Sequence, residues 1–294
     1  MRPANLFTAM ADILAGVAAM GALSGAGSSF TISLVAPILL LLIAASVCLY
    51  AGGVVLNDAF DVEIDRIERP ERPIPSGILL RHHAFIFGFT LLIMGCLFAL
   101  FANTVSGLVA IILAVSILCY DSFSKHSVFW GPLNMGLCRG LNLLLGMSIV
   151  YSVGGGDLGR FYVLMILPVI YIAAITLISQ GEVVGGNKKA ILIAGFMYQL
   201  VILLLITLGY GLSFNIIQAL PFILVFVYLT VRPLLAAYKV NTPENIRQAV
   251  KSGVIAVIAL DASIAAGFST MLVGLLVLLL LPVSLFVGKR FAVT

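Results

Sequence analysis

Residues 38–65 read ILLLLIAASVCLYAGGVVLNDAFDVEID, an apolar run that ends in the densest polar cluster of the chain. The chain as a whole is similarly apolar, because 62% of its 294 residues are hydrophobic and only 10% are charged. Soluble globular proteins carry roughly 25% charged residues. Several apolar stretches here have the length of about 17 to 25 residues that crosses the hydrocarbon core of a bilayer. The sequence therefore predicts an integral, multi-pass membrane protein surrounded by membrane lipid.

Hydropathy divides the chain into ten candidate transmembrane segments. No tandem repeat and no charged or Pro-rich linker marks a second domain, so we expect one domain over residues 1–294. The predicted fold class is all-α, a polytopic bundle of nine to ten transmembrane helices, and the count depends on whether Gly267 and Ser269 join the last two segments. The segments are 8–25, 31–55, 84–102, 104–120, 132–151, 161–179, 189–209, 214–231, 250–268 and 270–288.

The positions of the basic residues indicate the orientation in the membrane. The net charge is +4, and lysine and arginine concentrate in the cytoplasmic loops of membrane proteins. Nearly all of them lie near the loops 56–83, 121–131, 180–188 and 232–249 or in the C-terminal tail, whereas Arg160 lies on the other side. We expect a bacterial inner (plasma) membrane protein with these loops and both termini in the cytoplasm. Because the charge reports topology, we expect no nucleic-acid partner, and protein partners stay open.

The polar cluster repeats an oxygen-bearing side chain every four residues, at Asn57, Asp61 and Asp65. On a helix this spacing places the three side chains on one face. Carboxylates that share a face repel one another unless a cation lies among them, and Mg²⁺ prefers oxygen ligands, including those of phosphate groups. The spacing therefore predicts a helix that binds Mg²⁺ and a diphosphate, with Asp58 beside the metal.

A basic loop follows this helix. It contains Arg66, Arg69, Arg72 and Arg81, and its prolines and Gly77 interrupt any helix. Guanidinium groups form paired hydrogen bonds with phosphate oxygens, so we expect the loop to bind the same anion as the metal. The alternative is a solvated loop whose arginines only set topology, but topology requires no carboxylates at a fixed spacing.

The stretch from Asn57 to Gly77, an NDxxDxxxD motif followed by an Arg-Pro-rich loop, resembles the first aspartate-rich motif of the UbiA superfamily of intramembrane prenyltransferases. The resemblance extends over the chain and implies a bundle of about nine helices. It also implies transfer of a prenyl group from an isoprenoid diphosphate to an acceptor, with Mg²⁺ as the cofactor. In this sequence it implies catalytic roles for Asp61 and Asp65, and substrate binding by Asn57, Asp58, Arg66 and Arg72.

A lysine element of the family also has a counterpart here. Family members carry a Tyr-x-x-x-Lys-like element after the fourth helix, in which the lysine contacts the diphosphate; here Tyr120 and Lys125 are five residues apart, one more than expected. Lys125 is therefore either a catalytic, diphosphate-binding lysine, with Tyr120 beside the substrate, or a lysine that only sets topology.

The second acidic motif of the family, Asp-x-x-x-Asp after the sixth helix, is altered here. Glu182 takes the place of the first aspartate, but Gly186 takes the place of the second. We expect Glu182 to be a further metal ligand and substrate contact, with Asn187 and Lys188 as substrate-binding residues. Loss of one carboxylate should weaken Mg²⁺ binding at this motif.

The altered motif leaves two functions open. The leading prediction is Mg²⁺-dependent transfer of a prenyl group to a small or lipid acceptor, which the sequence does not identify. However, the run from Gly181 to Asn187 is similar to a divergent UbiA-like subgroup found with Ebo biosynthetic clusters, whose members are suspected of helping to export a small metabolite precursor. The alternative is therefore a catalytically divergent relative that takes part in biosynthesis or export of such a precursor.

Ionisable residues inside the transmembrane segments are costly and are candidates for function. Arg139 and Asn142 are three residues apart, so they share a helix face. They form either a polar wall of the substrate cavity or interhelical hydrogen bonds. Asp261 is a candidate partner for Arg139 in a structural ion pair, and Asp12 lies closer to a membrane boundary. A secondary transporter would need more charged midplane residues than these.

Overall fold

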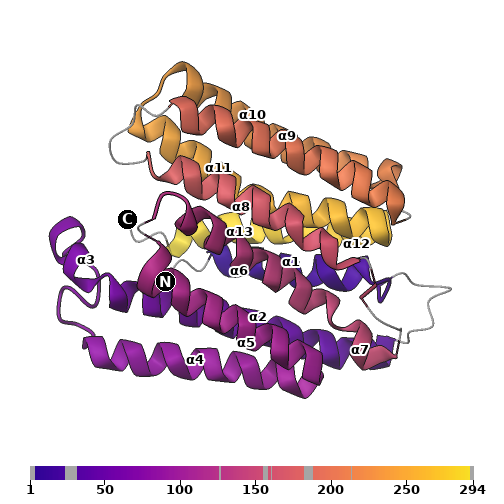
Figure 1. Cartoon of the computed structure of the whole chain (residues 1–294), viewed down its shortest axis with the longest axis horizontal. Helices are drawn as coiled ribbons and strands as arrows, with labels where there is room; N and C mark the ends of the chain where they lie inside the picture. Colours follow the sequence, from indigo (N-terminus) through magenta and orange to yellow (C-terminus); the bar gives the residue numbers. More distant parts are fainter. Residues whose placement is uncertain are drawn as a thin grey trace.

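The apolar runs form long helices, because a chain in lipid must satisfy its backbone hydrogen bonds within each segment. The structure is a computed structural model that describes residues 4–23, 32–125, 127–154, 158–159, 161–181, 188–212 and 214–291. Within these residues every regular element is a helix. The long helices run roughly side by side (Figure 1), in agreement with the predicted all-α bundle.

The described residues form fifteen helical elements in chain order. Their bounds are α1 Ala4–Ala19, α2 Ile32–Phe60, α3 Val62–Glu68, α4 Arg81–Ala102, α5 Thr104–Cys119, the π-helical η1 Tyr120–Ser124, α6 Trp130–Met147, α7 Val150–Val153, the 3-10 helix η2 Phe161–Met165, α8 Ile166–Ser179, α9 Lys188–Gly211, α10 Ile216–Lys239, α11 Pro243–Phe268, α12 Met271–Leu278 and α13 Leu280–Phe291.

Among the described residues, nine helical stretches are long and apolar enough to cross a membrane, which agrees with the predicted nine to ten. The predicted first segment, 8–25, is the shorter helix α1 of 16 residues. At 1.5 Å per residue it spans about 24 Å, less than the roughly 30 Å of a hydrocarbon core. The last two predicted segments are separate, because α11 ends at Phe268 and the Thr270 side chain accepts a hydrogen bond from the backbone N–H of Val273 at the start of α12.

The predicted cytoplasmic loop 232–249 is mostly helical, which corrects the sequence analysis. α10 continues to Lys239, and α11 begins at Pro243, with the Thr242 side chain accepting a hydrogen bond from the N–H of Asn245. The basic residues therefore lie on helix ends. Hydropathy detects the part of a helix that lies in hydrocarbon, so a helix that continues into the polar interface reads as a loop.

α1 occupies the middle of the bundle (Figure 1). Its side chains contribute to three separate apolar clusters of the core, so it is surrounded by other helices. A Cβ added to Gly16 would lie 2.4 Å from the carbonyl oxygen of Leu143, and one added to Gly146 would lie 2.5 Å from that of Ile13. Glycine therefore permits direct backbone contact between α1 and α6, and this contact brings the polar residues of the two helices together.

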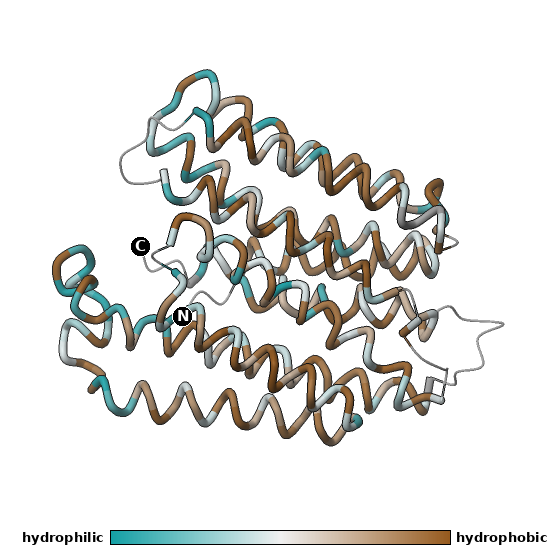
Figure 2. The backbone as a smooth tube through the Cα atoms, viewed as in Figure 1, coloured by the Kyte–Doolittle hydropathy of each residue, from teal (hydrophilic) through white to brown (hydrophobic). Residues whose placement is uncertain are grey.

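Polar residues concentrate at the ends of the helices. Figure 2 shows hydrophilic residues around α3 and the loop that follows it, while the lengths of the long helices are largely apolar. Large apolar side chains of α4 are exposed, for example Ile86 and Phe101. Exposed apolar side chains along a helix fit a lipid surrounding, whereas α3 and its loop form a polar end of the bundle.

Candidate diphosphate and metal site

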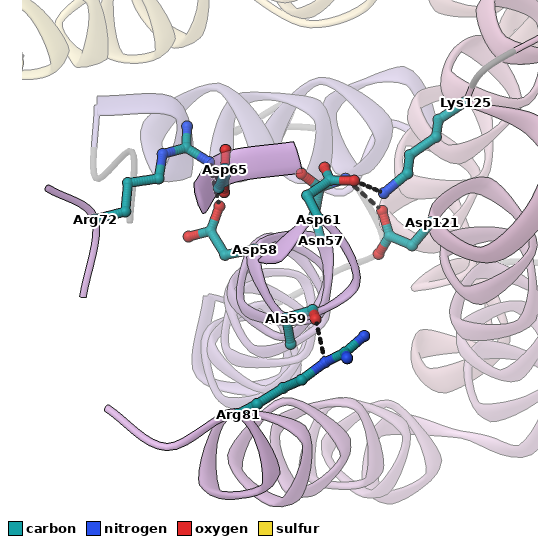
Figure 3. A network of polar contacts seen from close by, with 9 residues as sticks. All are labelled: Asn57, Asp58, Ala59, Asp61, Asp65, Arg72, Arg81, Asp121 and Lys125. Carbon is teal, nitrogen blue, oxygen red and sulfur yellow. Dashed lines mark hydrogen bonds and ion pairs between the residues drawn. The ribbon is translucent and has the colours of Figure 1, made fainter. Parts of the chain in front are cut away.

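The candidate site forms where α2 bends into α3. Asp61 separates the two helices with φ −84° and ψ 5°. The backbone hydrogen bonds nevertheless continue across the bend, from the N–H of Asp61 to the carbonyl of Asn57 (3.0 Å) and from the N–H of Asp65 to the carbonyl of Asp61 (2.8 Å). The bend sorts the predicted single row of side chains into two groups that face different partners (Figure 3).

The first group surrounds Arg72. Its guanidinium Nη1 donates to Asp65 Oδ2 at 2.6 Å and to Asp58 Oδ1 at 3.2 Å. The Asp65 side chain is only 7% exposed, so this charge is held largely away from water. The loop returns toward α4 through Gly77, whose φ of +81° favours glycine. The Arg-Pro-rich loop therefore folds back onto the acidic helix end.

The second group surrounds Asp61. Lys125 forms an ion pair with Asp61 through its Nζ atom, and Asn57 Nδ2 donates to Asp121 Oδ1 at 2.9 Å (Figure 3). The ion pair is mostly shielded, since the Lys125 side chain is 10% exposed. Asp121 is buried and was not selected from the sequence; its position directly after Tyr120 is the only local signal that marks it.

The unusual spacing of Tyr120 and Lys125 has a structural explanation. Residues Tyr120–Ser124 form a π-helical turn, and the N–H of Lys125 donates to the carbonyl of Tyr120 at 3.1 Å. A π-helical turn closes over five residues where an α-helical turn closes over four. The extra residue is thus absorbed within the turn, and Lys125 points back toward Asp61.

The charges of the site leave room for a cation. Four carboxylates, those of Asp58, Asp61, Asp65 and Asp121, lie around two cationic side chains, Arg72 and Lys125. Two negative charges are left over, which matches the charge of one divalent ion, and the available donors are the oxygen ligands that Mg²⁺ prefers. In the described part of the chain, however, no three His, Cys, Asp or Glu side chains are already grouped as metal ligands.

Arg66, Arg81 and Lys188 contact other groups than these four carboxylates. Arg66 pairs with Glu63 at 2.8 Å on an exposed surface, and Arg81 donates its Nε to the carbonyl of Ala59 at 3.0 Å, at the end of α2. Lys188 begins α9, with its Nζ 5.7 Å from the ring centroid of Tyr238. Tyr120 begins the π-helical turn and is partly buried. The predicted residues Glu182 and Asn187 lie outside the described residues.

Arg139 and Asn142 belong to a second group, deeper in the bundle. Arg139 Nη1 lies 3.0 Å from Asp12 Oδ2, and Asn142 Nδ2 donates to the same oxygen at 2.8 Å. The ion pair of Arg139 that the structure contains is therefore with Asp12, whereas the sequence analysis expected Asp261. Asp12 is fully buried and not at a boundary, because its helix α1 runs through the middle of the bundle.

Asn142 serves as a bridge between helices. Its Nδ2 also donates to the carbonyl of Ala9 at 2.9 Å, and its Oδ1 accepts from the Ser46 hydroxyl at 2.7 Å. These bonds join α1, α2 and α6. They correspond to the interhelical alternative of the sequence analysis, and a substrate contact of Asn142 stays a prediction.

The fold and site define a membrane-type helical bundle with an acidic, oxygen-rich site. Two cationic side chains at this site, Arg72 and Lys125, are paired with its carboxylates. Residues 14–250 match the model of the UbiA prenyltransferase family. The chain belongs to this family.

Two curated relatives, both named digeranylgeranylglyceryl phosphate synthase, resemble the chain. The protein from Methanosarcina mazei is 34% identical over 137 residues, which are 47% of this chain and 46% of the relative. The protein from Saccharolobus solfataricus is 28% identical over 227 residues, 70% of this chain and 78% of the relative. The first match thus spans less than half the length of its relative.

Solved structures share the fold. A UbiA homologue from Aeropyrum pernix in its apo form superposes with a TM-score of 0.66 at 16% identity, covering 86% of this chain and 96% of that one. A UbiA homologue from Archaeoglobus fulgidus, bound to DMAPP and Mg²⁺, gives a TM-score of 0.51 at 15% identity, covering 94% and 98%. At these identities the likeness establishes the fold.

Proposed function

We propose that the protein is a Mg²⁺-dependent prenyltransferase that moves a prenyl group from an isoprenoid diphosphate to an acceptor within the membrane. The observation that carries this proposal is the acidic site at the junction of α2 and α3, in which Arg72 and Lys125 pair with three carboxylates and Asn57 donates to a fourth, that of Asp121. Membership of the UbiA prenyltransferase family supports it. The family relative bound to DMAPP and Mg²⁺ supports the class of donor substrate and the metal.

The proposed metal ligands are the carboxylates of Asp61 and Asp65 and the side-chain oxygen of Asn57, with Asp58 and Asp121 beside them. Glu182 is a further proposed ligand from the sequence. When bound, Mg²⁺ would neutralise the negative charge of the departing diphosphate. The two negative charges that Arg72 and Lys125 leave uncompensated are the reason why a divalent cation fits here.

Arg72 and Lys125 would stabilise the leaving group. Both cations are paired with carboxylates in the structure. In the proposed reaction each would exchange its carboxylate for a diphosphate oxygen, and the released carboxylates would be free to hold Mg²⁺. Positioned cations at a developing anion lower the barrier to bond breaking. The allylic C–O bond then breaks with its electron pair on pyrophosphate, the acceptor forms a new bond to the allylic carbon, and the acceptor loses a proton.

The apolar body of the bundle would bind the isoprenoid chain. Apolar walls keep water from the allylic cation and so prevent hydrolysis. The basic residues gathered at the end that carries α3 favour a cytoplasmic location for this end. The donor would therefore enter with its diphosphate toward the cytoplasm and its hydrocarbon tail in the membrane.

The test is pyrophosphate release by the purified protein with Mg²⁺, a panel of isoprenoid diphosphates and a panel of small and lipid acceptors. Asp61→Ala should abolish release. Glu63→Ala is the matched control, because Glu63 is a neighbouring carboxylate that is 66% exposed and pairs with Arg66; it should leave release close to wild type. Full activity of Asp61→Ala would refute the proposal. Diphosphate binding without release by the wild type would favour the alternative of a divergent relative, which the Gly186 substitution in the second motif supports.

A further inference from the structure

A pocket of about 640 Å³ lies between α3, the loop that follows it and the start of α4. We call it the interfacial pocket. Its lining includes Arg66 of α3, Arg81 and His82 of α4, and apolar side chains such as those of Leu80 and Phe85. Arg66, Arg81 and His82 are exposed, so the pocket can be reached from outside the protein. It combines basic and apolar walls at the polar end of the bundle.

The two arginines of this pocket carry more charge than the carboxylate between them. Glu63 lies 2.8 Å from Arg66 Nη1 and 3.9 Å from Arg81 Nη1, so two guanidinium groups and one carboxylate leave one positive charge. Arg81 is held in place by the hydrogen bond from its Nε to the carbonyl of Ala59 (Figure 3), and its terminal nitrogens can reach a ligand. Guanidinium groups bind phosphate oxygens. The pocket therefore fits one phosphate group.

An apolar groove begins farther along α4. It has a volume of about 340 Å³ and lies between α4 and α5, with Phe89 and Leu100 of α4 and Ile111 of α5 in its lining. The lining consists of apolar residues and one cysteine. From Phe89 to Leu100 the groove follows α4 for eleven residues, about 16 Å. This length is about half of the roughly 30 Å hydrocarbon core, which is the depth of one leaflet.

The interfacial pocket and the groove lie on one face of α4. Their lining residues on this helix are three, four, four and seven residues apart, at His82, Phe85, Phe89, Ile93 and Leu100. Such spacing places side chains on one helix face. Phe85 in the pocket and Phe89 in the groove are one turn apart, about 6 Å along the helix. A phosphate site at the polar end thus continues into an apolar groove, which matches the headgroup and one chain of a phospholipid.

We propose that this surface binds one anionic phospholipid, with its phosphate between Arg66 and Arg81 and one acyl chain in the groove between α4 and α5. The headgroup is anionic because the pocket has one uncompensated positive charge, and basic residues at a membrane surface attract anionic lipids. The acyl chain fills the groove because atoms that line an unfilled space lose dispersion contacts. Arg66, for which the family resemblance implies substrate binding, would thus hold a lipid.

The experiment measures lipid retention by the full-length protein in detergent, with native mass spectrometry as the readout. The probes are phosphatidylglycerol and phosphatidylcholine with the same dioleoyl chains, added in equal amounts. We expect the wild type to retain one phosphatidylglycerol in preference to phosphatidylcholine. Arg66→Gln and Arg81→Gln should each weaken the binding of phosphatidylglycerol by about fivefold, because each removes one charge beside the phosphate. Glutamine at position 81 keeps a donor for the carbonyl of Ala59.

Arg247→Gln is the matched control for Arg66→Gln. Arg247 is 63% exposed against 61% for Arg66, and each pairs with a glutamate three residues before it. Arg247 does not line the interfacial pocket, so its variant should retain phosphatidylglycerol as the wild type does. Equal retention of the two lipids by the wild type, or wild-type retention in both variants of the pocket, would overturn the inference.

Ile111→Trp tests the groove. The larger side chain takes the space of the acyl chain, so the binding of phosphatidylglycerol should fall by at least about tenfold, the effect of about two methylene groups that are no longer buried. Ile112→Trp is the control, because Ile112 is the neighbouring isoleucine, 53% exposed against 51%, and does not line the groove. Equal binding by the two variants would refute the placement of the chain.

Two other occupants of this surface are distinguished by the same preparation. If geranylgeranyl diphosphate without Mg²⁺ displaces the phosphatidylglycerol, the pocket belongs to the donor substrate and the inference fails. If the wild type forms a dimer that Ile111→Trp abolishes, the groove belongs to a second copy of the chain and the inference also fails. Retention of phosphatidylglycerol against both tests supports it. None of these measurements needs turnover, so the result is independent of the proposed function.

Discussion

Replacement of Lys125 by glutamine tests the site most directly. The substitution removes one positive charge and keeps a polar side chain of similar length. In the structure Lys125 pairs with Asp61 and both are largely shielded, with side chains 10% and 21% exposed. In the proposed reaction Lys125 exchanges this carboxylate for an oxygen of the diphosphate. The variant therefore loses a positioned cation at the atom where negative charge develops.

The expected loss of kcat follows from the role of Lys125 as a cation positioned at the leaving group. Removing one positioned donor from a developing anion typically lowers kcat by about 10²- to 10³-fold, and we expect Lys125→Gln to fall in that range. The variant should also lower the free energy of unfolding, by about 1 to 3 kcal/mol, because the largely shielded Asp61 carboxylate loses its partner. The kcat values should therefore be compared well below the Tm of both proteins.

The assay measures pyrophosphate release at saturating Mg²⁺ together with the Tm of the detergent-purified protein. Lys239→Gln, at the exposed end of α10, removes a lysine charge from the same polar end and is the control; it should retain wild-type kcat. A kcat of Lys125→Gln within about threefold of the wild type would show that Lys125 only sets topology, the alternative that the sequence left open.

Three other perturbations have definite expected outcomes. Arg72→Gln should lower pyrophosphate release by about tenfold more than Arg72→Lys, because charge is lost only in the first variant; equal rates would argue against an electrostatic role. Phe123 is 82% exposed in the π-helical turn. Its deletion should leave at least about a tenth of the activity, because the shortened turn can close as an α-helical turn that presents Lys125 on the same face. Complete loss of activity in a folded protein would contradict this. Gly146→Ala should lower the Tm by several degrees because its Cβ would lie 2.5 Å from a carbonyl of α1, whereas Gly211→Ala, with no atom within 4 Å, should not; equal Tm values would show that α1 can shift without loss.

Local patterns in the sequence determined the fold class. The apolar segments are continuous in the chain and long enough to cross a bilayer, so hydropathy alone predicted nine to ten helices, and the nine membrane-length stretches of the described residues agree. It misplaced the ends of α10 and α11, because a helix that leaves the hydrocarbon no longer differs in hydropathy from a loop. Hydropathy also predicted α1 as a normal membrane span. A helix that is buried among other helices is as apolar as one that faces lipid, so hydropathy does not report where a helix lies in the bundle.

The composition of the candidate site was also a local property. Asn57, Asp61 and Asp65 are close in the chain, on either side of the bend between α2 and α3, so their spacing was sufficient to predict one acidic site, and the family resemblance added Lys125. Their roles in binding and catalysis stay predictions. The spacing of Tyr120 and Lys125 revealed an extra residue, but only the structure showed that a π-helical turn absorbs it.

Only the tertiary structure decided which charges meet. Lys125 and Asp61 are 64 residues apart in the chain, and Asn142 and Asp12 are 130 apart. No spacing predicts such pairs, because they depend on which helices pack together and how closely. The glycines of α1 and α6 allow that close packing, and this is why Asp12 pairs with Arg139 inside the bundle. The sequence by itself determined a membrane bundle with an acidic motif; the packing of α1 against α6 decided that a second polar centre exists inside that bundle.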